Sequence, residues 1–393
     1  MRAKIIYSGL IGLFIFTLSV KELHSENNTE QIRYLWKTYD VGKNADGLEI
    51  GDIDGDGKNE LVVGNRGSRD LTIFKQDKNN KNSLVYFYTQ KINWACGVID
   101  ITDINQDGFE DVVVAHYADY ASTGKTDTFG VCYQNPETHR LDHEINYKFP
   151  FGHSSRAIGA GDVNSDGRAE IVVANEIFGK KIYVWGWNNR KSELELQETY
   201  GNINNYVVSI SIGDVNGDKK NDVVLHGSSI FVFTQAKDGK LSPPKRYNGG
   251  GESADIGDVN NDGLNDVVGA TAHSKRIEIW LQTPSHVLKN AERKRAGSYT
   301  EDVEVADLNN DGFADIAVAC KQKSELLVFL QNESGQLERS QRFKASPNKW
   351  LNELAVGDLN GDNISDIAGS DWGYAGLGKI VDSKVNVWFS VRD

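Results

Sequence analysis

The sequence predicts an all-β fold, a seven-bladed β-propeller of four-stranded blades, from three observations. A short acidic loop recurs seven times, and the first aspartates of successive copies are 51, 59, 52, 44, 49 and 51 residues apart. Each loop is flanked by apolar and β-branched runs that are typical of strands. The last repeat lacks its fourth strand, and the N-terminal region contains a strand-like run that could supply it. Units of about 50 residues that each supply four strands are typical of propeller blades.

The residue pattern predicts the order of strands within each repeat. A short apolar stretch such as residues 48–51 precedes the loop, and a β-branched run such as residues 61–64 follows it. A third run is often aromatic, as in residues 182–185, and a more polar fourth run closes the unit. The last repeat stops after its third run, whereas residues 32–39 resemble a fourth strand without a blade. We therefore expect residues 32–39 to complete blade seven and leave no free ring edge.

The recurring loop has the composition of a site for a hard cation. Carboxylates or amides occupy positions 1, 3, 5 and 9 of every copy. These candidate ligands are Asp52, Asp54, Asp56, Glu60, Asp103, Asn105, Asp107, Asp111, Asp162, Asn164, Asp166, Glu170, Asp214, Asn216, Asp218, Asp222, Asp258, Asn260, Asp262, Asp266, Asp307, Asn309, Asp311, Asp315, Asp358, Asn360, Asp362 and Asp366. Calcium is the usual occupant because it accepts six to eight oxygen ligands in irregular geometry. An EF-hand is excluded, because position 12 lacks glutamate and β-branched residues, not a helix, follow the loop.

Position 6 of the loop requires a left-handed turn, which glycine allows. Glycine occupies it in five copies, whereas Lys219 and Asn363 replace it in the fourth and seventh. Asparagine adopts this conformation readily, but a lysine costs roughly 1 kcal/mol there. We expect up to seven structural Ca²⁺ ions, with the weakest binding at the fourth site. A structural role follows because the same saturated oxygen set recurs in every blade.

These repeats resemble FG-GAP (VCBS-type) repeats, the unit of the integrin α-subunit propeller, of many secreted bacterial proteins and of some fungal lectins. The resemblance covers about residues 30–393. It implies metal loops between the first and second strands on the lower face of the ring. It also implies ligands on the opposite face or, in the lectins, between blades.

Composition restricts the partners and the redox chemistry. The formal charge is −13, but loss of residues 1–25 and binding of seven divalent ions would bring it close to −1. The acidity is therefore mostly metal-ligand carboxylate, and no basic stripe for nucleic acid is evident. Cys96 and Cys132 fall on the first and third strands of one blade, roughly 9.6 Å apart and beyond disulfide reach. With Cys320, we expect three buried thiols.

The first 25 residues have the pattern of a signal peptide. Arg2 and Lys4 precede an apolar stretch at residues 5–20, and residues 23–25 offer a cleavage site. A retained anchor is the alternative, but the stretch is short for a spanning helix of about 20 residues. We therefore expect a secreted, monomeric propeller at residues 26–393, without stable membrane insertion.

The face opposite the calcium loops carries the candidate ligand-binding residues. It is formed by the segments that enter the first strand and leave the second, and two of them, 116–127 and 371–383, are long. The catalytic candidates are His116, Tyr117, His226, His273 and Arg156. The substrate-binding candidates are Arg66, His153, Trp94, Trp350, Trp372 and Lys321. The tryptophans suit either ordinary packing or the stacking of sugar rings.

One hypothesis for this face is β-elimination on a uronic-acid sugar, by a lyase or a dehydratase acting on an anionic carbohydrate. His116 or Tyr117 would abstract the proton at C5, and His226 or His273 would protonate the leaving group. Arg156 or Arg66 would neutralise the sugar carboxylate. The family resemblance adds that several propeller-fold lyases use such residues and that a sugar dehydratase is similar to these repeats.

The alternative is a non-catalytic lectin or adhesion module that binds glycans or a protein. The candidate residues differ from blade to blade, which favours one asymmetric site in either case. If His116, His226 and His273 converge, they would form a zinc site, because imidazole is the common ligand of zinc.

Overall fold

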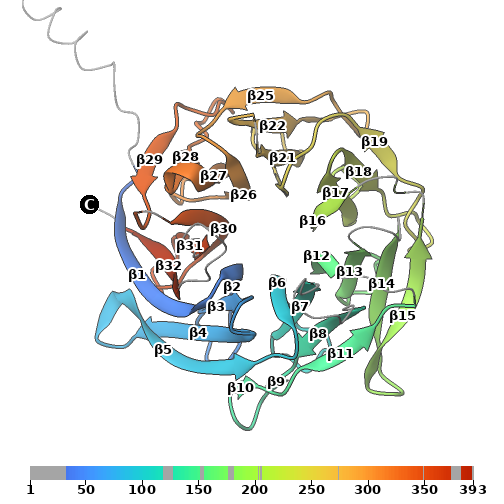
Figure 1. Ribbon diagram of the computed structural model, residues 1–393. Coiled ribbons are helices and arrows are strands. Elements are labelled where there is room, and N and C mark those ends of the chain that lie inside the picture. The colour runs from blue at the N-terminus through green and yellow to red at the C-terminus, as the bar shows by residue number, and fades with distance from the viewer. Residues whose placement is uncertain are drawn as a thin grey trace, which may run out of the picture. The chain divides into compact units, whose positions relative to one another are not determined.

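The acidic loops connect neighbouring antiparallel strands, and these strands pair in chain order around a ring (Figure 1). The computed structural model describes residues 32–117, 127–150, 155–175, 181–201, 203, 206–272, 274–347, 349–372 and 382–391. Within them, the ring consists of seven four-stranded sheets, each with one strand next to the axis and one at the rim. The predicted propeller is therefore confirmed. The expected signal peptide at residues 1–25 lies outside the described residues.

The first four blades follow the predicted order of strands. Blade 1 contains β2 (Ala45–Gly51), β3 (Glu60–Asn65), β4 (Asp70–Asp77) and β5 (Asn80–Lys91). Blade 2 contains β6 (Ala95–Thr102), β7 (Asp111–Tyr117), β8 (Thr128–Cys132) and β11 (Ile145–Lys148). Blade 3 contains β12 (Ser155–Gly161), β13 (Glu170–Asn175), β14 (Ile182–Asn188) and β15 (Glu193–Tyr200). Blade 4 contains β16 (Val207–Gly213), β17 (Asp222–Gly227), β18 (Ile230–Phe233) and β19 (Lys245–Tyr247).

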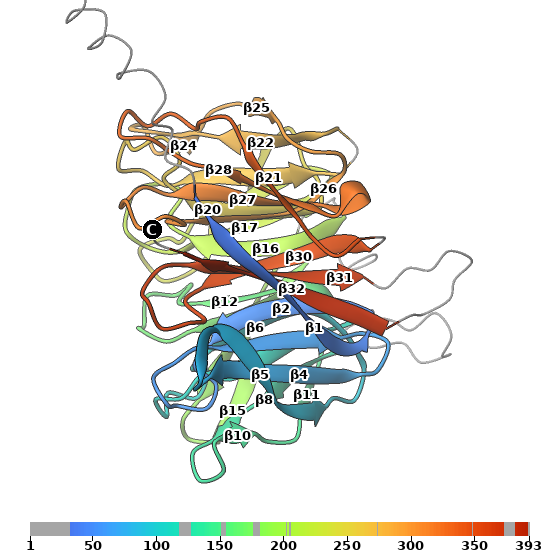
Figure 2. The ribbon, with the colours of Figure 1, turned by 90° about the vertical axis from the view of Figure 1, so that its left-hand side faces the viewer.

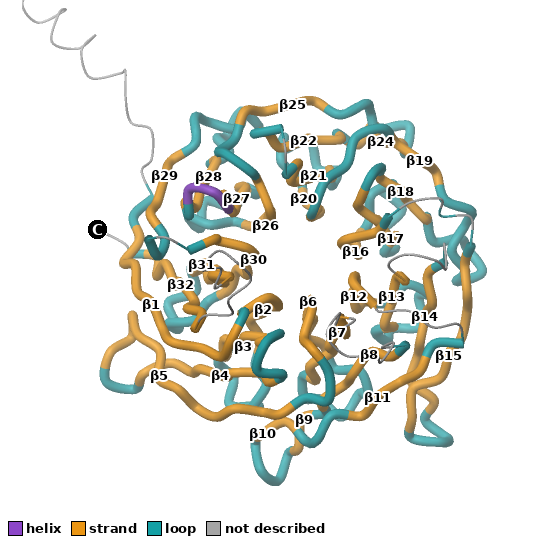
Figure 3. The backbone as a smooth tube through the Cα atoms, viewed as in Figure 1, coloured by secondary structure: helices purple, strands orange, loops and turns teal. Residues whose placement is uncertain are grey.

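The remaining blades keep this order. Blade 5 contains β20 (Ser253–Gly257), β21 (Asp266–Thr271), β22 (Arg276–Trp280) and β25 (Glu292–Arg295). Blade 6 contains β26 (Thr300–Ala306), β27 (Asp315–Cys320), β28 (Glu325–Phe329) and β29 (Gln341–Lys344). Blade 7 contains β30 (Trp350–Gly357), β31 (Asp366–Trp372), β32 (Asp382–Ser390) and β1 (Tyr34–Lys43). Two small hairpins precede the outer strands of blades 2 and 5, namely β9 (Gln134–Asn135) with β10 (Arg140–Leu141) and β23 (Gln282–Thr283) with β24 (Val287–Leu288). The 3-10 turn η1 (Lys321–Lys323) is the one helical element of the described chain (Figure 3).

Blade 7 closes the ring as predicted, because its outer strand comes from the other end of the chain. β1 pairs with β32 in antiparallel register, with Trp36 opposite Trp388, and Figures 1 and 2 both show the two strands side by side. The Trp36 indole also donates a hydrogen bond to Asn386 Oδ1 at 3.1 Å. The two ends of the propeller are thereby joined, and no blade edge of the ring is left open.

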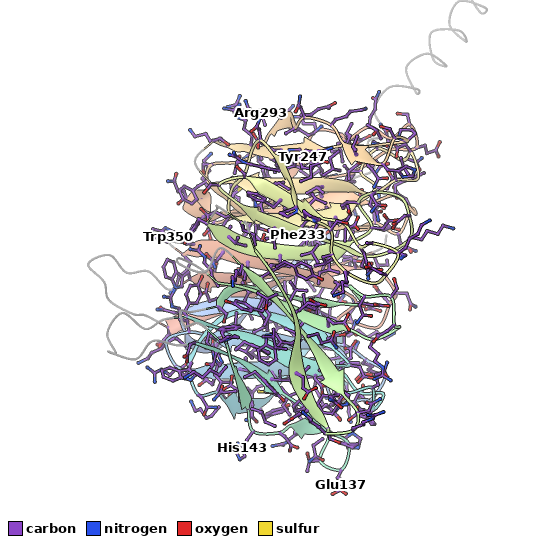
Figure 4. All side chains as sticks on the ribbon, turned by 90° about the vertical axis from the view of Figure 1, so that its right-hand side faces the viewer. Glu137, His143, Phe233, Tyr247, Arg293 and Trp350 are labelled. Carbon is purple, nitrogen blue, oxygen red and sulfur yellow. The ribbon has the colours of Figure 1, made fainter. Side chains whose placement is uncertain are left out.

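The hydrophobic core lies between blades, because each sheet packs face to face against its neighbours. One buried cluster joins Val172 of β13 to Val223 of β17, and another joins Val268 of β21 to Ile316 of β27. The second strand of each blade is covered on both faces, which explains why its sequence is a continuous β-branched run. In Figure 4, Phe233 lies inside the blades, whereas His143 and Glu137 lie at the outer edge.

The three cysteines are buried and free, as predicted. Cys96 lies on β6, Cys132 on β8 and Cys320 on β27. Burial raises the pKa of the Cys96 and Cys132 thiols well above its ordinary value. These thiols are therefore packing groups within the blades.

Candidate functional site

Each acidic loop joins the first strand of a blade to the second, as predicted. Position 6 has a positive φ in all seven copies, including Lys219 at 66° and Asn363 at 61°. Position 4 also has a positive φ in every copy, for example 72° at Gly55 and 59° at Gln106. The two left-handed residues curl the backbone around the carboxylates that precede and follow them.

The first loop shows how the oxygen donors converge. One carboxylate oxygen from each of Asp52, Asp54 and Glu60 lies within 4.8 Å of the others. Asp52 also accepts the backbone N–H groups of Asp56 and Gly57, at 3.1 and 2.8 Å, which fixes its orientation. The other six copies have asparagine at position 3, so their sites carry one negative charge fewer. In blade 1 the Lys75 ammonium lies 2.7 Å from Asp54 Oδ2 and offsets part of the extra charge.

The ninth position carries a buried acid that lacks a compensating cation in most loops. Burial, followed by repulsion from neighbouring aspartates, raises the pKa of Glu60 to about 9. Burial likewise raises the pKa of Asp222 to about 7, although Asp222 accepts the N–H groups of Val215 and Gln235. Glu60 Oε2 is buried without a hydrogen-bond partner among the described residues. Convergent oxygens with surplus negative charge fit a hard divalent cation such as calcium.

Sequence reasoning missed a second repeated residue near these loops. Glutamine recurs at or just after the end of the third strand in five blades, at Gln76, Gln134, Gln235, Gln282 and Gln331. Gln331 Nε2 donates to the carbonyl of Asp258, in the loop of the preceding blade, at 2.9 Å. Gln76 Nε2 donates to the carbonyl of Asn360, at position 3 of the loop in the preceding blade of the ring. The recurrence of glutamine at a constant place in the repeat was the sequence signal that could have revealed these contacts.

A cavity of about 650 Å³ lies along the propeller axis, bounded by the innermost strands of the blades. Its lining contains nine carboxylates against three cationic side chains, so the surplus charge is negative. The carboxylates belong to Asp46, Glu49, Asp100, Glu252, Asp255, Glu301, Asp302, Glu304 and Glu353. None of them was a sequence-predicted site residue.

The three cations of the cavity, Arg66, Arg156 and Lys321, are already engaged by acids. Arg66 lies 3.7 Å from Asp46 and stacks over the Tyr117 ring, with 4.0 Å between the guanidinium carbon and the ring centroid. Arg156 lies 3.4 Å from Glu252. Lys321 contacts Glu301 and donates to Asn352 Oδ1 at 3.2 Å. All three were sequence-predicted site residues, and the structure gathers them around one cavity with Tyr117 and Trp372.

Three of the cavity aspartates have a structural task. Asp100, Asp255 and Asp302 each accept a backbone N–H from the innermost strand of the next blade, at 2.7 Å in every case. The inner edge of that strand faces the axis, so its N–H groups have no further strand to pair with. These aspartates therefore satisfy the exposed inner edges of the sheets.

The remaining glutamates of the cavity, Glu49, Glu304 and Glu353, have no cationic partner among the described residues. Glu49 accepts only the N–H of Ile50, at 3.3 Å. Burial, together with the charges of neighbouring acids, raises the pKa of all three carboxyls well above the ordinary value. They are the acids of the cavity that no cation of the described chain compensates, and the raised pKa values mean that the cavity by itself favours their protonated, neutral form.

Two predicted catalytic histidines lie inside the blades, which corrects the expectation that they are accessible from the top face. His116 is completely buried, and its ring nitrogens contact Glu144 Oε1 at 2.8 Å and Thr128 Oγ1 at 2.9 Å. His226 is also completely buried and packs edge-on against Trp280, and burial lowers its pKa to about 3. Both belong to second strands, which are covered on both faces.

His116 and His226, two of the three histidines that would form a zinc site if they converged, lie in different blades. His116 lies on β7 in blade 2 and His226 on β17 in blade 4, so blade 3 separates them. His273 and His153 lie outside the described residues, as does most of the two long loops.

The predicted tryptophans are divided between two places. Trp350 and Trp372 form a tilted pair with ring centroids 6.0 Å apart, and the Lys321 ammonium lies 5.2 Å from the Trp372 ring. Trp372 lines the axial cavity, and Figure 4 shows Trp350 at one face of the ring. Trp94 precedes β6 and does not line the cavity.

Comparison with known proteins identifies the repeats. The FG-GAP-like repeat family matches residues 52–114, 103–173, 162–225, 214–268, 258–318 and 307–369. Because these matches cover most of the chain, the protein belongs to the FG-GAP-like repeat family. No curated protein shows a significant match to the chain.

Solved structures share the fold at low sequence identity. The structure titled BBS1N in complex with ARL6DN, soaked with lead, aligns with a TM-score of 0.60 and 12% identity over 92% of this chain and 98% of that one. The mercury-soaked form aligns with a TM-score of 0.60 and 12% identity over 91% and 97% of the two chains. In the described residues, no helix is long and apolar enough to cross a membrane.

Proposed function

We propose that this FG-GAP-like repeat protein is a binding propeller that receives a basic side chain of a protein partner in its axial cavity. The observation that carries the proposal is the group of three glutamates, Glu49, Glu304 and Glu353, in a cavity whose own cations are all engaged by other acids of its lining. An incoming ammonium or guanidinium group would supply the missing positive charge. A cation beside these carboxyls would lower their raised pKa values and hold them in the ionised form, because a nearby opposite charge favours the charged state.

The shape of the cavity agrees with a small inserted group. A volume of about 650 Å³ is in the usual range of small-molecule pockets and has room for an inserted arginine or lysine side chain. Arg66, Arg156 and Lys321, each held by an acid, would repel a second basic residue that approached them directly. The cavity therefore favours one buried basic anchor, as is common at the centre of protein interfaces. The BBS1N structures, whose titles name ARL6DN as partner, provide a fold-level parallel.

Elimination on a uronic-acid sugar is less well supported by the geometry. That chemistry needs a base and an acid beside one substrate, within hydrogen-bond reach. His116 is bonded to Glu144, and His226 lies in the blade interior, so neither lines the cavity. Tyr117 and Arg156 do line it, but burial raises the pKa of Tyr117, so its hydroxyl stays protonated at neutral pH and is not available as a base. Catalysis and glycan binding are therefore alternatives, and the binding experiment described below is designed to detect them.

The proposal includes calcium and export. Calcium at the seven loops would compensate the acids at positions 1, 3, 5 and 9 and hold the turns between first and second strands. Cleavage of a signal peptide at residues 1–25 would place the propeller outside the cytoplasm, where calcium is abundant and where partners are surface or secreted proteins.

The test measures binding of a deca-lysine peptide and of matched neutral and acidic peptides by calorimetry in calcium-containing buffer. The variant Glu304→Gln/Glu353→Gln replaces two acids of the cavity, which could ionise beside a bound cation, by neutral amides of the same size. Because the chain has a net charge of −13, a polycation will also bind its outer surface weakly. The matched control is therefore Glu137→Gln/Glu193→Gln, which removes two exposed acids from blades 2 and 3.

We expect the cavity variant to weaken binding at least about tenfold, the effect of losing roughly 1.4 kcal/mol. The control should change the affinity by less than about twofold. An equal loss of affinity in both variants would show that the peptide responds only to the surface charge of the protein. The cavity would then be excluded as the binding site. If the protein bound a glycan array and the cavity variant did not, the ligand of the cavity would be a sugar and not a protein. Formation of ultraviolet-absorbing unsaturated uronate ends would instead establish a lyase.

A further inference from the structure

The junctions between neighbouring blades are filled by a repeated tyrosine at the rim of the propeller. In four junctions its hydroxyl oxygen accepts the backbone N–H of a leucine in the next blade, at 2.9 to 3.4 Å. These pairs are Tyr39 with Leu84, Tyr88 with Leu141, Tyr200 with Leu241 and Tyr247 with Leu288. The aromatic ring occupies the wedge that opens between two sheets as they diverge from the axis.

The junction between blades 5 and 6 departs from this rule. Lys294 pairs with Ile277 across β25 and β22 in the same way that Tyr247 pairs with Ile230 in blade 4. Its ammonium donates to the carbonyl of Leu337 at 2.7 Å, where tyrosine elsewhere accepts from the leucine N–H. The junction thus keeps the leucine contact but loses the aromatic ring and gains a positive charge.

A groove of about 560 Å³ lies at this junction. It is lined by six cationic side chains and a single acid, Glu338. The cations are Lys275, Lys294, Arg295, Lys323, Arg339 and Arg342. Such a concentration of positive charge stands out in a chain whose formal net charge is −13.

Most of these cations have no acidic partner. Arg342 pairs with Glu325 at 3.0 Å, and Lys294 is bonded to a carbonyl. Lys275, Arg295, Lys323 and Arg339 are exposed and form no ion pair within the described chain. At the groove wall, Ser298 Oγ is buried and has no hydrogen-bond partner among the described residues. The groove therefore offers free positive charge together with an unsatisfied hydroxyl.

We propose that this groove binds an anionic polysaccharide through its sulfate or carboxylate groups. Arginine and lysine side chains from β25, β29 and the segments beside them surround the groove, so one chain can meet several of them at once. Arginine matches the geometry of sulfate and carboxylate oxygens with paired N–H donors. The site is separate from the axial cavity, because no residue lines both.

The lining favours a polysaccharide over other polyanions. Among the apolar side chains of the lining, Phe329 and Ala296 are only 2% and 6% exposed and Leu337 is half-buried, so the groove offers little apolar surface to anchor an acidic peptide. The same burial leaves no aromatic face on which nucleic-acid bases could stack. A flat lipid surface would contact protruding side chains, whereas these cations surround a hollow.

The experiment measures binding of dextran sulfate and of polygalacturonate to the whole calcium-loaded chain, with neutral dextran as the uncharged probe. The first variant, Lys294→Tyr, introduces the tyrosine that is found at the four junctions described above and is compatible with folding for that reason. The second, Lys275→Glu/Arg295→Glu, reverses two exposed charges. The matched control, Lys81→Glu/Lys237→Glu, reverses two exposed lysines on blades 1 and 4. Thermal unfolding checks that every variant is folded.

We expect both groove variants to weaken binding of the anionic probes about tenfold, with a smaller salt dependence, and the control to keep most of its affinity. Preference for dextran sulfate or for polygalacturonate identifies the anionic group. Wild-type affinity in Lys294→Tyr and in the double reversal, or binding of single-stranded DNA or phosphatidylserine vesicles in preference to both polysaccharides, would overturn the proposal. The cavity variant Glu304→Gln/Glu353→Gln should bind these polymers normally, so failure of one proposal does not entail failure of the other.

Discussion

The calcium-type loops and the axial cavity are built on the same strands but differ in how faithfully they repeat. Every loop has an aspartate at positions 1 and 5, an acid at position 9 and positive φ at positions 4 and 6. Three residues before each loop, on the innermost strand, the side chains differ from blade to blade: Glu49, Asp100, Gly159, Ser211, Asp255, Glu304 and Ala355. The repeated region serves the fold of every blade. The varied region lines one asymmetric cavity, and this departure from the repeat is where we propose that a partner binds.

Removing divalent ions is the strongest test of the repeated region. We expect a calcium chelator to lower the free energy of unfolding by about 4 kcal/mol for each site that was saturated a thousandfold above its Kd. Thermal unfolding followed by circular dichroism measures the effect, and elemental analysis counts the ions. Asp307→Ala should lose one ion and part of this stability. A melting temperature that does not respond to the chelator would show that the loops fold without metal.

A change of pH should distinguish the cavity from the loops, with an effect on stability smaller than that of removing calcium. Burial raises the pKa of Glu304 well above its ordinary value of 4.5 and that of Asp100 to about 6. A carboxyl with a raised pKa binds protons more tightly when folded, so stability falls as pH rises from the unfolded pKa to the folded one. Glu304→Gln should therefore stabilise the protein by about 1 kcal/mol above neutral pH and have little effect near pH 4.

The measurement is chemical unfolding across this pH range in excess calcium, so that the loops stay loaded. Glu137→Gln, on an exposed hairpin, is the control and should change stability at neither pH. A destabilised Glu304→Gln protein at high pH would mean that this carboxylate has a stabilising partner after all.

The smallest expected effect concerns the one lysine at position 6. Lys219 has a φ of 66°, which glycine adopts without strain. Lys219→Gly should raise stability by up to about 1 kcal/mol and tighten ion binding at the fourth loop. Asn363→Gly should gain less, because asparagine tolerates this conformation. Equal gains would show that side-chain strain does not set the differences among the loops.

The sequence by itself determined the fold, because the fold depends on a pattern that recurs along the chain. Seven loops at near-constant spacing, flanked by strand-like runs, specify seven blades, and the unmatched strand at residues 32–39 specifies how the ring closes. The loop conformation was equally local, since Asp, Asn and Gly at fixed positions dictate the turn. Arg66, Tyr117, Arg156, Lys321 and Trp372 were also found from their places relative to the strands.

Tertiary structure alone decided which side chains reach a common space. His116 and His226 stand where the sequence predicts accessible loops, but the second strands continue through them and the neighbouring blades cover both faces. Glu49, Glu304 and Glu353 line one cavity although they come from blades 1, 6 and 7, and the basic groove combines side chains from two blades. Local spacing along a chain encodes turns and strands, whereas proximity across the ring depends on how whole blades pack.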